Sequence, residues 1–308
     1  MTQLDVSHAV DTLFSGAVPE RADELRASWA GADRVRLLDV SRFLLQASYG
    51  TIQVSEKSLR LIWLTSFTSW SAVEAYNTRI VIERFNERPF DPMGWSSQPQ
   101  QKNLDERFDQ LLRKVQELDA LSTIEDFEWP EGIPVPTESM VIDEVTQKAT
   151  FDLICMAGAF VFAHELRHAL FDRSGTRPEK LIDEEFECDR WALALILDDV
   201  TAYAVNTAQD VTLVRAKRVL GVIFAQLTIL ALTPRERWDE TKDHPAVRSR
   251  LRLTLDAATD PVPEWFWTTV ASILTAFVRS LGTLPPPTPF PATDRELAYM
   301  LCEAIRSR

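Results

Sequence analysis

The sequence predicts a mainly α-helical protein with a few short strands. Glycine is sparse, at 9 of 308 residues, and apolar residues recur at helical spacing along most of the chain. Runs with the two-residue alternation of a strand are few and short. The apolar content of 45% is ordinary for a globular protein, so we expect the chain to fold without help.

In the N-terminal part, apolar spacing predicts small helices and one strand ahead of a longer helix. The small helices are expected over residues 5–14, 22–29 and 34–48, and the strand over residues 49–54. Ser55 is the expected N-cap of the longer helix, which should run to Tyr76.

A stretch rich in Pro, Gln and Ser, residues 88–103, is expected to be a loop and the seam between two parts of the chain. Residues 1–100 would then form a mainly helical N-terminal region, a candidate lid or partner-docking part. Residues 101–308 would form the core around the chemistry described below, with a C-terminal helical strap.

The expected elements of this second part are a strand over residues 140–145 and helices over residues 104–121, 211–232, 245–257, 264–280 and 294–305. The proline-rich segment 284–291 is expected to be a stiff extended spacer that lets the last helix dock back.

Charge and cysteine content restrict the partners and the compartment. A net charge of -13, without a basic cluster, argues against nucleic acid and anionic membranes as partners. The longest apolar run, residues 219–232, is too short to cross a bilayer. Three cysteines at unrelated spacings are expected to be reduced thiols, and no secretory signal is recognisable. We therefore expect a cytoplasmic protein.

The run His-Glu-Leu-Arg-His, which begins at His164 and ends at His168, is the most specific chemical signal in the chain. Side chains four apart lie on one face of a helix, so the two histidines can present ring nitrogens to one metal ion. Glu165 lies about 100° around the axis and can approach that ion without ligating it. The apolar run 151–163 argues for a buried helix rather than a solvated pair. The motif therefore predicts a helical, zincin-like zinc peptidase with Glu165 as its catalytic base.

Catalytic zinc keeps three protein ligands, so a third donor is needed. The motif helix is expected to end at Gly175, and a capping box at residues 176–179 should start the next helix at once. So short a turn makes the two helices antiparallel neighbours. The acidic cluster 183–189 then lies opposite the motif.

Within this cluster, Glu185 shares the stripe that must pack inward, so it is the predicted third zinc ligand, with Glu184 as the reserve. Asp189, one turn later, is predicted to accept the remaining ring N–H of a ligand histidine. The alternative for Asp189 is an ordinary ion pair with an arginine such as Arg167.

The motif followed by Glu-Phe-Glu-Cys-Asp at residues 185–189 resembles the gluzincin metallopeptidases, in which Glu-x-x-x-Asp on a second helix completes the zinc site. His244-Pro245, with Arg250 six residues after the histidine, is similar to a helix start in that clan. The resemblance implies that His244 stabilises the oxyanion and that Arg250 orients His244 or Asp189. A plain helix start with Pro245 as its first residue is the other interpretation.

The motif helix is preceded by Ile-Gln-Val-Ser at residues 52–55 and Leu-Arg-Leu-Ile-Trp at residues 59–63. With these segments, the chain is similar over residues 45–255 to the Lit-type phage-exclusion peptidases, cytoplasmic chains of similar size with a central zinc helix. Arg167 departs from most such motifs, which have an uncharged residue before the second ligand. The resemblance implies a dedicated endopeptidase in anti-phage abortive defence, with a component of the translation machinery as its suggested substrate.

The predicted function is thus a cytoplasmic Zn²⁺-dependent endopeptidase that cleaves a specific intracellular protein. An extended substrate would pair with an edge strand, for which residues 49–54 and 140–145 are the candidates. We expect the activity to need a specific folded target or an activating trigger. The alternatives are a broad-specificity housekeeping metallopeptidase and a metal-stabilised sensor or binding protein without proteolytic activity.

Overall fold

The computed structural model describes residues 6–29, 35–137, 142–258 and 262–307, and within them the chain is mainly helical. The helices are α1 (Val6–Ala17), α2 (Ala22–Trp29), α3 (Glu56–Phe85), α4 (Pro92–Trp95), α5 (Pro99–Ala120), α6 (Val145–Ser174), α7 (Leu181–Leu197), α8 (Val200–Thr207), α9 (Val211–Leu232), α10 (Val247–Ala257), α11 (Glu264–Ser280) and α12 (Asp294–Glu303). The strands are β1 (Val35–Leu38), β2 (Leu45–Ser48) and β3 (Thr51–Ser55). The predicted fold class, mainly α with a few short strands, is confirmed.

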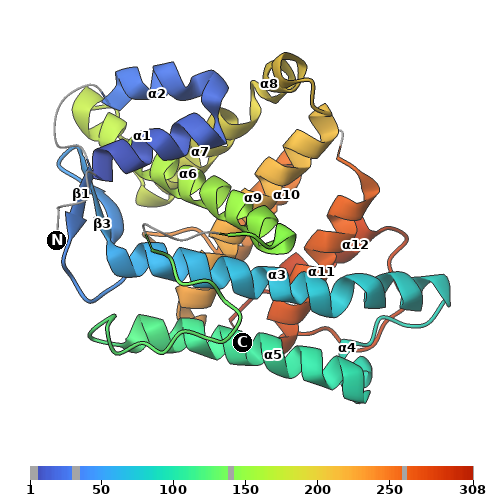
Figure 1. Ribbon diagram of the computed structural model, residues 1–308. Helices are drawn as coiled ribbons and strands as arrows, with labels where there is room; N and C mark the ends of the chain where they lie inside the picture. The colour runs from blue at the N-terminus through green and yellow to red at the C-terminus, as the bar shows by residue number, and fades with distance from the viewer. Residues whose placement is uncertain (1–5, 30–34, 138–141, 259–261, 308) are drawn as a thin grey trace.

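Two long helices of the described chain, α3 and α6, organise the molecule. Figure 1 shows α3 crossing the centre, with α5 along one side of it and α6 and α1 on the other. Helix α9 packs against α3 and α6, and α11 packs against α3 and α12. The largest cluster of buried apolar side chains draws on residues from both sides of position 100, for example Phe14 and Phe160. The role of the N-terminal region as a lid or docking part stays a prediction.

The small sheet has the order β1-β3-β2, with β1 parallel and β2 antiparallel to the central strand β3. It lies at the N-terminal end of α3, because β3 leads directly into that helix. Helix α6 contacts both β2 and β3. The sheet therefore brings one of its edges, strand β2, to the helix that carries the histidine motif.

Several predicted helices are confirmed, and their caps show why. Ser55 caps α3 by accepting a hydrogen bond from the backbone of Ser58. Gly175 ends α6 in the left-handed conformation, with φ at 66°, which glycine adopts without strain. The C-terminal helix docks back as expected: Phe90 and Thr288 form a β-bridge, and α12 packs on α10 and α11.

The predicted helix over residues 34–48 is wrong, because this segment contains β1 and β2. Val35 pairs with Ile52 and Leu45 with Val54, so both strands exist through partners distant in sequence. Such pairing overrides local helical spacing. The strand prediction for residues 140–145 is also wrong where it can be checked, since residues 142–144 are irregular and Val145 begins α6. Residues 140–141 lie outside the described residues.

The loop predicted over residues 88–103 is wrong in part. Helix α3 continues past its predicted end at Tyr76 to Phe85, and in the added part Arg79 and Glu83 form an ion pair one turn apart at 2.8 Å. Residues 88–103 therefore follow a longer helix than expected. Pro92 and Pro99 then each occupy the first turn of a new helix, a position that needs no backbone N–H. The prolines that suggested a loop are therefore helix-start residues.

The predicted capping box at residues 176–179 is wrong as well, because α7 begins at Leu181 without a side-chain cap. Thr176 instead hydrogen-bonds Ser174, at 2.7 Å between the hydroxyls. Arg177 pairs with Asp172 of α6 and with Glu184 of α7, so these ion pairs link the two helices across the connection.

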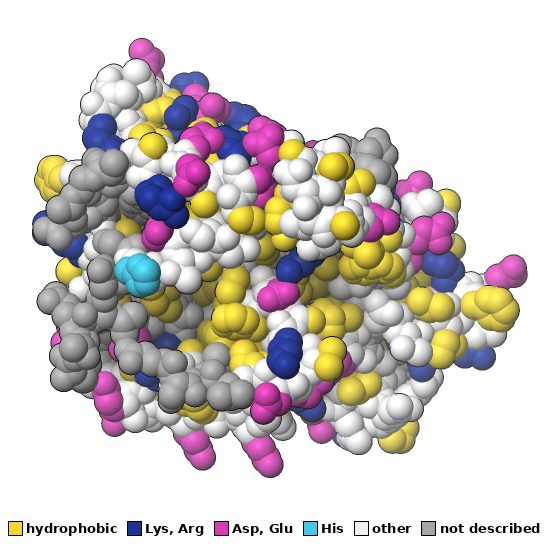
Figure 2. Space-filling view, turned by 45° about the horizontal axis from the view of Figure 1, so that its top comes forward, with side chains coloured by type: hydrophobic (Ala, Val, Ile, Leu, Met, Phe, Trp, Pro, Cys, Tyr) yellow, Lys and Arg dark blue, Asp and Glu magenta, His cyan; other side chains and the backbone are white. Residues whose placement is uncertain are grey.

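Among the described residues, α6 is the helix that is long and apolar enough to span a membrane by composition alone. More than half of its apolar window, 56%, is buried inside the protein, as expected for a central core helix. On the face shown in Figure 2, acidic side chains are scattered over the surface and hydrophobic side chains gather in a central hollow.

Candidate active site

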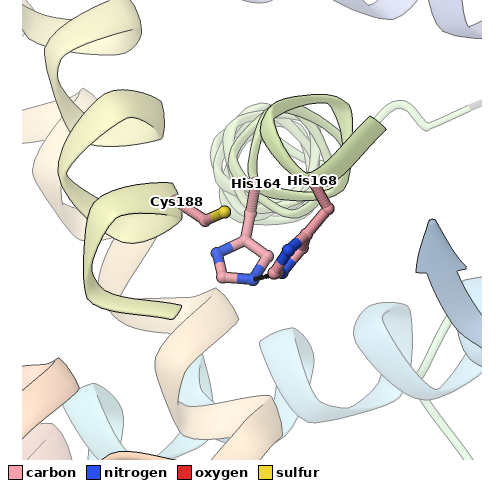
Figure 3. A group of neighbouring side chains, drawn as sticks. All are labelled: His164, His168 and Cys188. Carbon is pink, nitrogen blue, oxygen red and sulfur yellow. Dashed lines mark hydrogen bonds between the residues drawn. The ribbon is translucent and has the colours of Figure 1, made fainter. Parts of the chain in front are cut away.

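Helix α6 places the two motif histidines one above the other, with both rings turned toward α7. Their Nε2 atoms lie 3.2 Å apart, and the carboxylate of Glu185 faces both, at 3.5 Å from Nε2 of His164 and 3.4 Å from Nε2 of His168. Figure 3 shows the two rings meeting below the helix through these nitrogens. The predicted ligand set therefore converges on one small space.

These separations fit a metal ion. With zinc–nitrogen bonds near 2.0–2.1 Å, donors on a tetrahedral ion lie about 3.3 Å from one another. Burial disfavours the charged form of Glu185, but hydrogen bonds to both histidines outweigh it and hold its pKa well below the usual range. An ionised carboxylate and two imidazoles at these distances are a donor set that zinc accepts.

The Nδ1 atom of His164 has its own partner on α7. Asp189, fully buried, lies 2.9 Å from it. Arg250 from α10 donates two hydrogen bonds to Asp189, at 2.6 and 2.7 Å, and lies 3.6 Å from Glu185. Burial opposes ionisation of Asp189, but Arg250 and the histidine outweigh it and lower its pKa. The carboxylate thus lies beside Nδ1 of His164, and its role in holding a ligand ring stays a prediction.

Arg167, the alternative partner for Asp189, lies elsewhere. Its guanidinium stacks over Phe171 at 4.4 Å and faces Trp191 at 5.8 Å. The charge that departs from most such motifs is therefore placed against aromatic rings rather than at the ligand nitrogens.

Glu184, the reserve ligand of the sequence prediction, lies on the opposite side of the histidine. Its Oε1 lies 2.7 Å from Nδ1 of His168, away from the converging Nε2 atoms. Arg177 approaches the same oxygen at 3.4 Å. The sequence signal for this arrangement is the pair Glu184-Glu185, because two neighbouring carboxylates point about 100° apart around the helix and so reach opposite sides of a ring.

Glu165 lies where α6 meets the edge strand. Its Oε2 accepts a hydrogen bond from the backbone N–H of Ala47 in β2, at 2.6 Å. Burial raises the pKa of Glu165, although both histidines oppose the shift. A carboxylate that is partly buried, oriented and easier to protonate than usual is suited to accept a proton.

Cys188 is a competing third donor, since its sulfur and the two histidines lie close enough together to hold an ion. In Figure 3, however, the sulfur lies near the root of the His164 side chain, whereas the Nε2 atoms meet on the far side of the ring. Burial, with added repulsion from Glu185 and Glu184, raises the pKa of this thiol and disfavours the thiolate that metals bind. Both observations favour Glu185.

The two motif histidines open onto a cleft of about 960 Å³. Its walls include residues 45–47 of β2, the apolar side chains Phe160 and Ile229, and the rim residue His244. Because β3 is the central strand, residues 49–54 do not supply the edge expected of them, and β2 supplies it instead.

His244 and Arg250 have separate surroundings. His244 is exposed, whereas the guanidinium of Arg250 contacts His164 on α6 and Asp189 on α7. Arg250 is expected to orient either His244 or Asp189, and in the structure it contacts Asp189. A catalytic role for His244 stays a prediction.

With this geometry established, comparison with known proteins assigns the family. The family model described as Peptidase U49 matches residues 52–268, well over half of the chain. The chain belongs to the peptidase U49 family. No curated protein and no solved structure matches it.

The match places the activity of this U49 peptidase in proteolysis and covers the elements that carry the site. Helices α6 and α7 and the His244–Arg250 segment all fall inside residues 52–268. The edge strand β2 lies before the first matched residue. The family assignment thus supports peptide hydrolysis, and the geometry above indicates which residues are available to perform it.

Proposed function

We propose that this U49 peptidase is a zinc-dependent endopeptidase with His164, His168 and Glu185 as metal ligands and Glu165 as the catalytic base. The observation that carries the proposal is the convergence of both Nε2 atoms and the Glu185 carboxylate within 3.2 to 3.5 Å. Zinc would supply Lewis-acid activation of the scissile carbonyl and of the attacking water.

The protein's own residues account for the proton transfers. The Ala47 N–H holds Oε2 of Glu165, so Oε1 is the atom that takes a proton from the attacking water. As the water oxygen bonds to the carbonyl carbon and the C–N bond breaks, Glu165 returns that proton to the leaving amine nitrogen. Asp189 and Arg250 fix the ring of His164 during these steps.

Strand β2 is the proposed docking edge for an extended substrate. The Ala47 N–H is bonded to Glu165 rather than to β3, so this residue directs its backbone groups away from the sheet, and its carbonyl is the group that a substrate would pair with. By the alternation of an antiparallel ladder, Leu45 does the same. A substrate paired with this edge would pass Glu165, which is anchored on the same strand.

We further propose that the enzyme acts in the cytoplasm on one or few intracellular proteins, with a translation component in anti-phage defence as the candidate suggested by the Lit-type resemblance. The proposal rests on that resemblance and on the net charge of -13, which does not suit nucleic acid as a partner. Unrestrained hydrolysis would harm a cell, so purified protein should be nearly inactive on denatured casein until a specific target or trigger is present.

The test compares wild type with Glu165→Gln in bacterial cells, with and without phage challenge, by a proteome-wide search for new protein N-termini. One or two dominant cuts that need Glu165 support the proposal. Hundreds of such cuts would indicate a housekeeping peptidase instead. If no cut depends on Glu165 under either condition, the metal-stabilised sensor without activity becomes the better account.

A further inference from the structure

The two histidines are held by matching arrangements of acid and arginine, of which only one is explained by the reasoning above. On His164, Nδ1 contacts Asp189, and Asp189 contacts Arg250. On His168, Nδ1 contacts Glu184 at 2.7 Å, and Glu184 contacts Arg177 at 3.4 Å. Both carboxylates come from α7, and both are almost completely buried.

We infer that Glu184, held by Arg177, is a positioning residue that fixes the ring of His168 for metal binding. The inference rests on the proposed zinc site. Glu184 would touch neither metal nor substrate and would act only through His168.

The chemistry of imidazole supplies the reason. A neutral ring that offers the Nε2 lone pair to a metal carries its proton on Nδ1, and that N–H needs an acceptor when it is shielded from water. An anionic acceptor also makes the opposite nitrogen a better donor. Glu184 Oε1 is placed to serve both purposes, because it faces Nδ1 while Glu185 faces Nε2.

Arg177 completes the arrangement because a buried carboxylate is costly without a countercharge. Within the described part of the chain, the other oxygen of Glu184, Oε2, has no hydrogen-bond partner. His168 and Arg177 are therefore the two groups that hold this carboxylate, both at Oε1. Arg177 lies in the turn between α6 and α7, is 44% exposed and lines the cleft onto which the histidines open.

The experiment measures zinc affinity of metal-stripped full-length protein by competition with a chromophoric chelator. Glu184→Ala should weaken zinc binding by about 10- to 100-fold, the usual effect of losing such a partner. Glu184→Gln retains a neutral acceptor and should restore part of the affinity. Glu187→Gln, a surface change on the same helix beside Arg190, is the matched control and should bind like wild type.

A spectroscopic measurement separates positioning from general loss of structure. In ¹⁵N-histidine NMR of the zinc-loaded protein, the hydrogen-bonded Nδ1–H signal of His168 should disappear in Glu184→Ala, while that of His164 remains. Arg177→Ala, which leaves the helix residues intact, should weaken zinc binding in the same direction and serves if Glu184→Ala fails to fold.

The outcomes distinguish this inference from the proposed function. If wild type binds no stoichiometric zinc, the zinc-peptidase proposal is wrong. If wild type binds zinc and neither Glu184→Ala nor Arg177→Ala changes the affinity, the positioning role is wrong and the ligand set still stands.

Discussion

At the scale of single residues, the candidate site depends on which way each side chain points as much as on how close it lies to the histidines. Glu184, Glu185 and Cys188 all lie beside the motif histidines, yet each faces a different part of the rings. The sequence predicts the roles of the histidines and Glu165 because their spacing within one helix defines their directions. The pair Glu184-Glu185 signals that two carboxylates face different sides of a ring, but which histidine Glu184 meets depends on how α7 is placed against α6.

Replacing the third donor tests the ligand assignment. Glu185→Ala should lose stoichiometric zinc, because two histidines remain where three ligands are needed. Cys188→Ser should keep it, since the sulfur lies away from the converging Nε2 atoms. Metal analysis of the two purified variants decides the matter, and the reverse pattern would make Cys188 the ligand.

His244 is tested by kinetics on the identified target. If it stabilises the transition state, His244→Ala should lower kcat with unchanged zinc content and little change in KM. A loss of thermal stability at normal kcat would instead restore the plain helix-start interpretation.

At the scale of elements, local signals predict the helices and the strand over residues 49–54, found as β3, but not the other two strands. Ser55 and Gly175 mark ends of α3 and α6 through contacts within a few residues. Strands β1 and β2 depend on pairing with β3, and no local pattern encodes that choice of partner. The sequence therefore assigns the exposed edge of the sheet to the wrong segment, although it places the motif helix beside it correctly.

The contact between α6 and α9 is close enough to require glycine. A Cβ on Gly221 of α9 would lie 2.1 Å from Cβ of Met156 and 3.1 Å from the backbone oxygen of Leu153. Gly221→Ala should therefore force the two helices apart and lower the free energy of unfolding by about 1–3 kcal/mol.

The measurement is denaturant unfolding, with Gly16→Ala as the control. Gly16 lies in α1, and no atom of the described chain lies within 4 Å of the place that a Cβ would take there. The same substitution should therefore be neutral or stabilising at this position. Equal stability of both variants would show that α6 and α9 adjust without cost.

At the scale of the whole molecule, the proposed metal centre joins elements that are distant in sequence. Helices α6 and α7 would supply the donors, α10 supplies Arg250, and strand β2 holds Glu165. An ion bound there would stabilise the folded state by mass action, because the unfolded chain does not assemble this site.

Removing the metal should therefore lower stability as well as activity. At a free zinc concentration about 100 times the dissociation constant, the stabilisation is about 2.7 kcal/mol. Calorimetry should show a lower Tm for wild type after a chelator and a return on adding zinc. His168→Ala should have the lower Tm with and without chelator. If chelator leaves the Tm of wild type unchanged, the zinc site is contradicted.

The motif sits on one of the long helices of the core, and this limits how the enzyme can be controlled. The half of α6 before His164 is packed against α1, α3 and α9, so unwinding it would expose the core. Amide hydrogens of such a segment exchange with solvent only when the whole domain opens. Local melting of this half of α6 is therefore an unsuitable way to control the proposed active site, and we expect a trigger to act instead on which molecules enter the cleft.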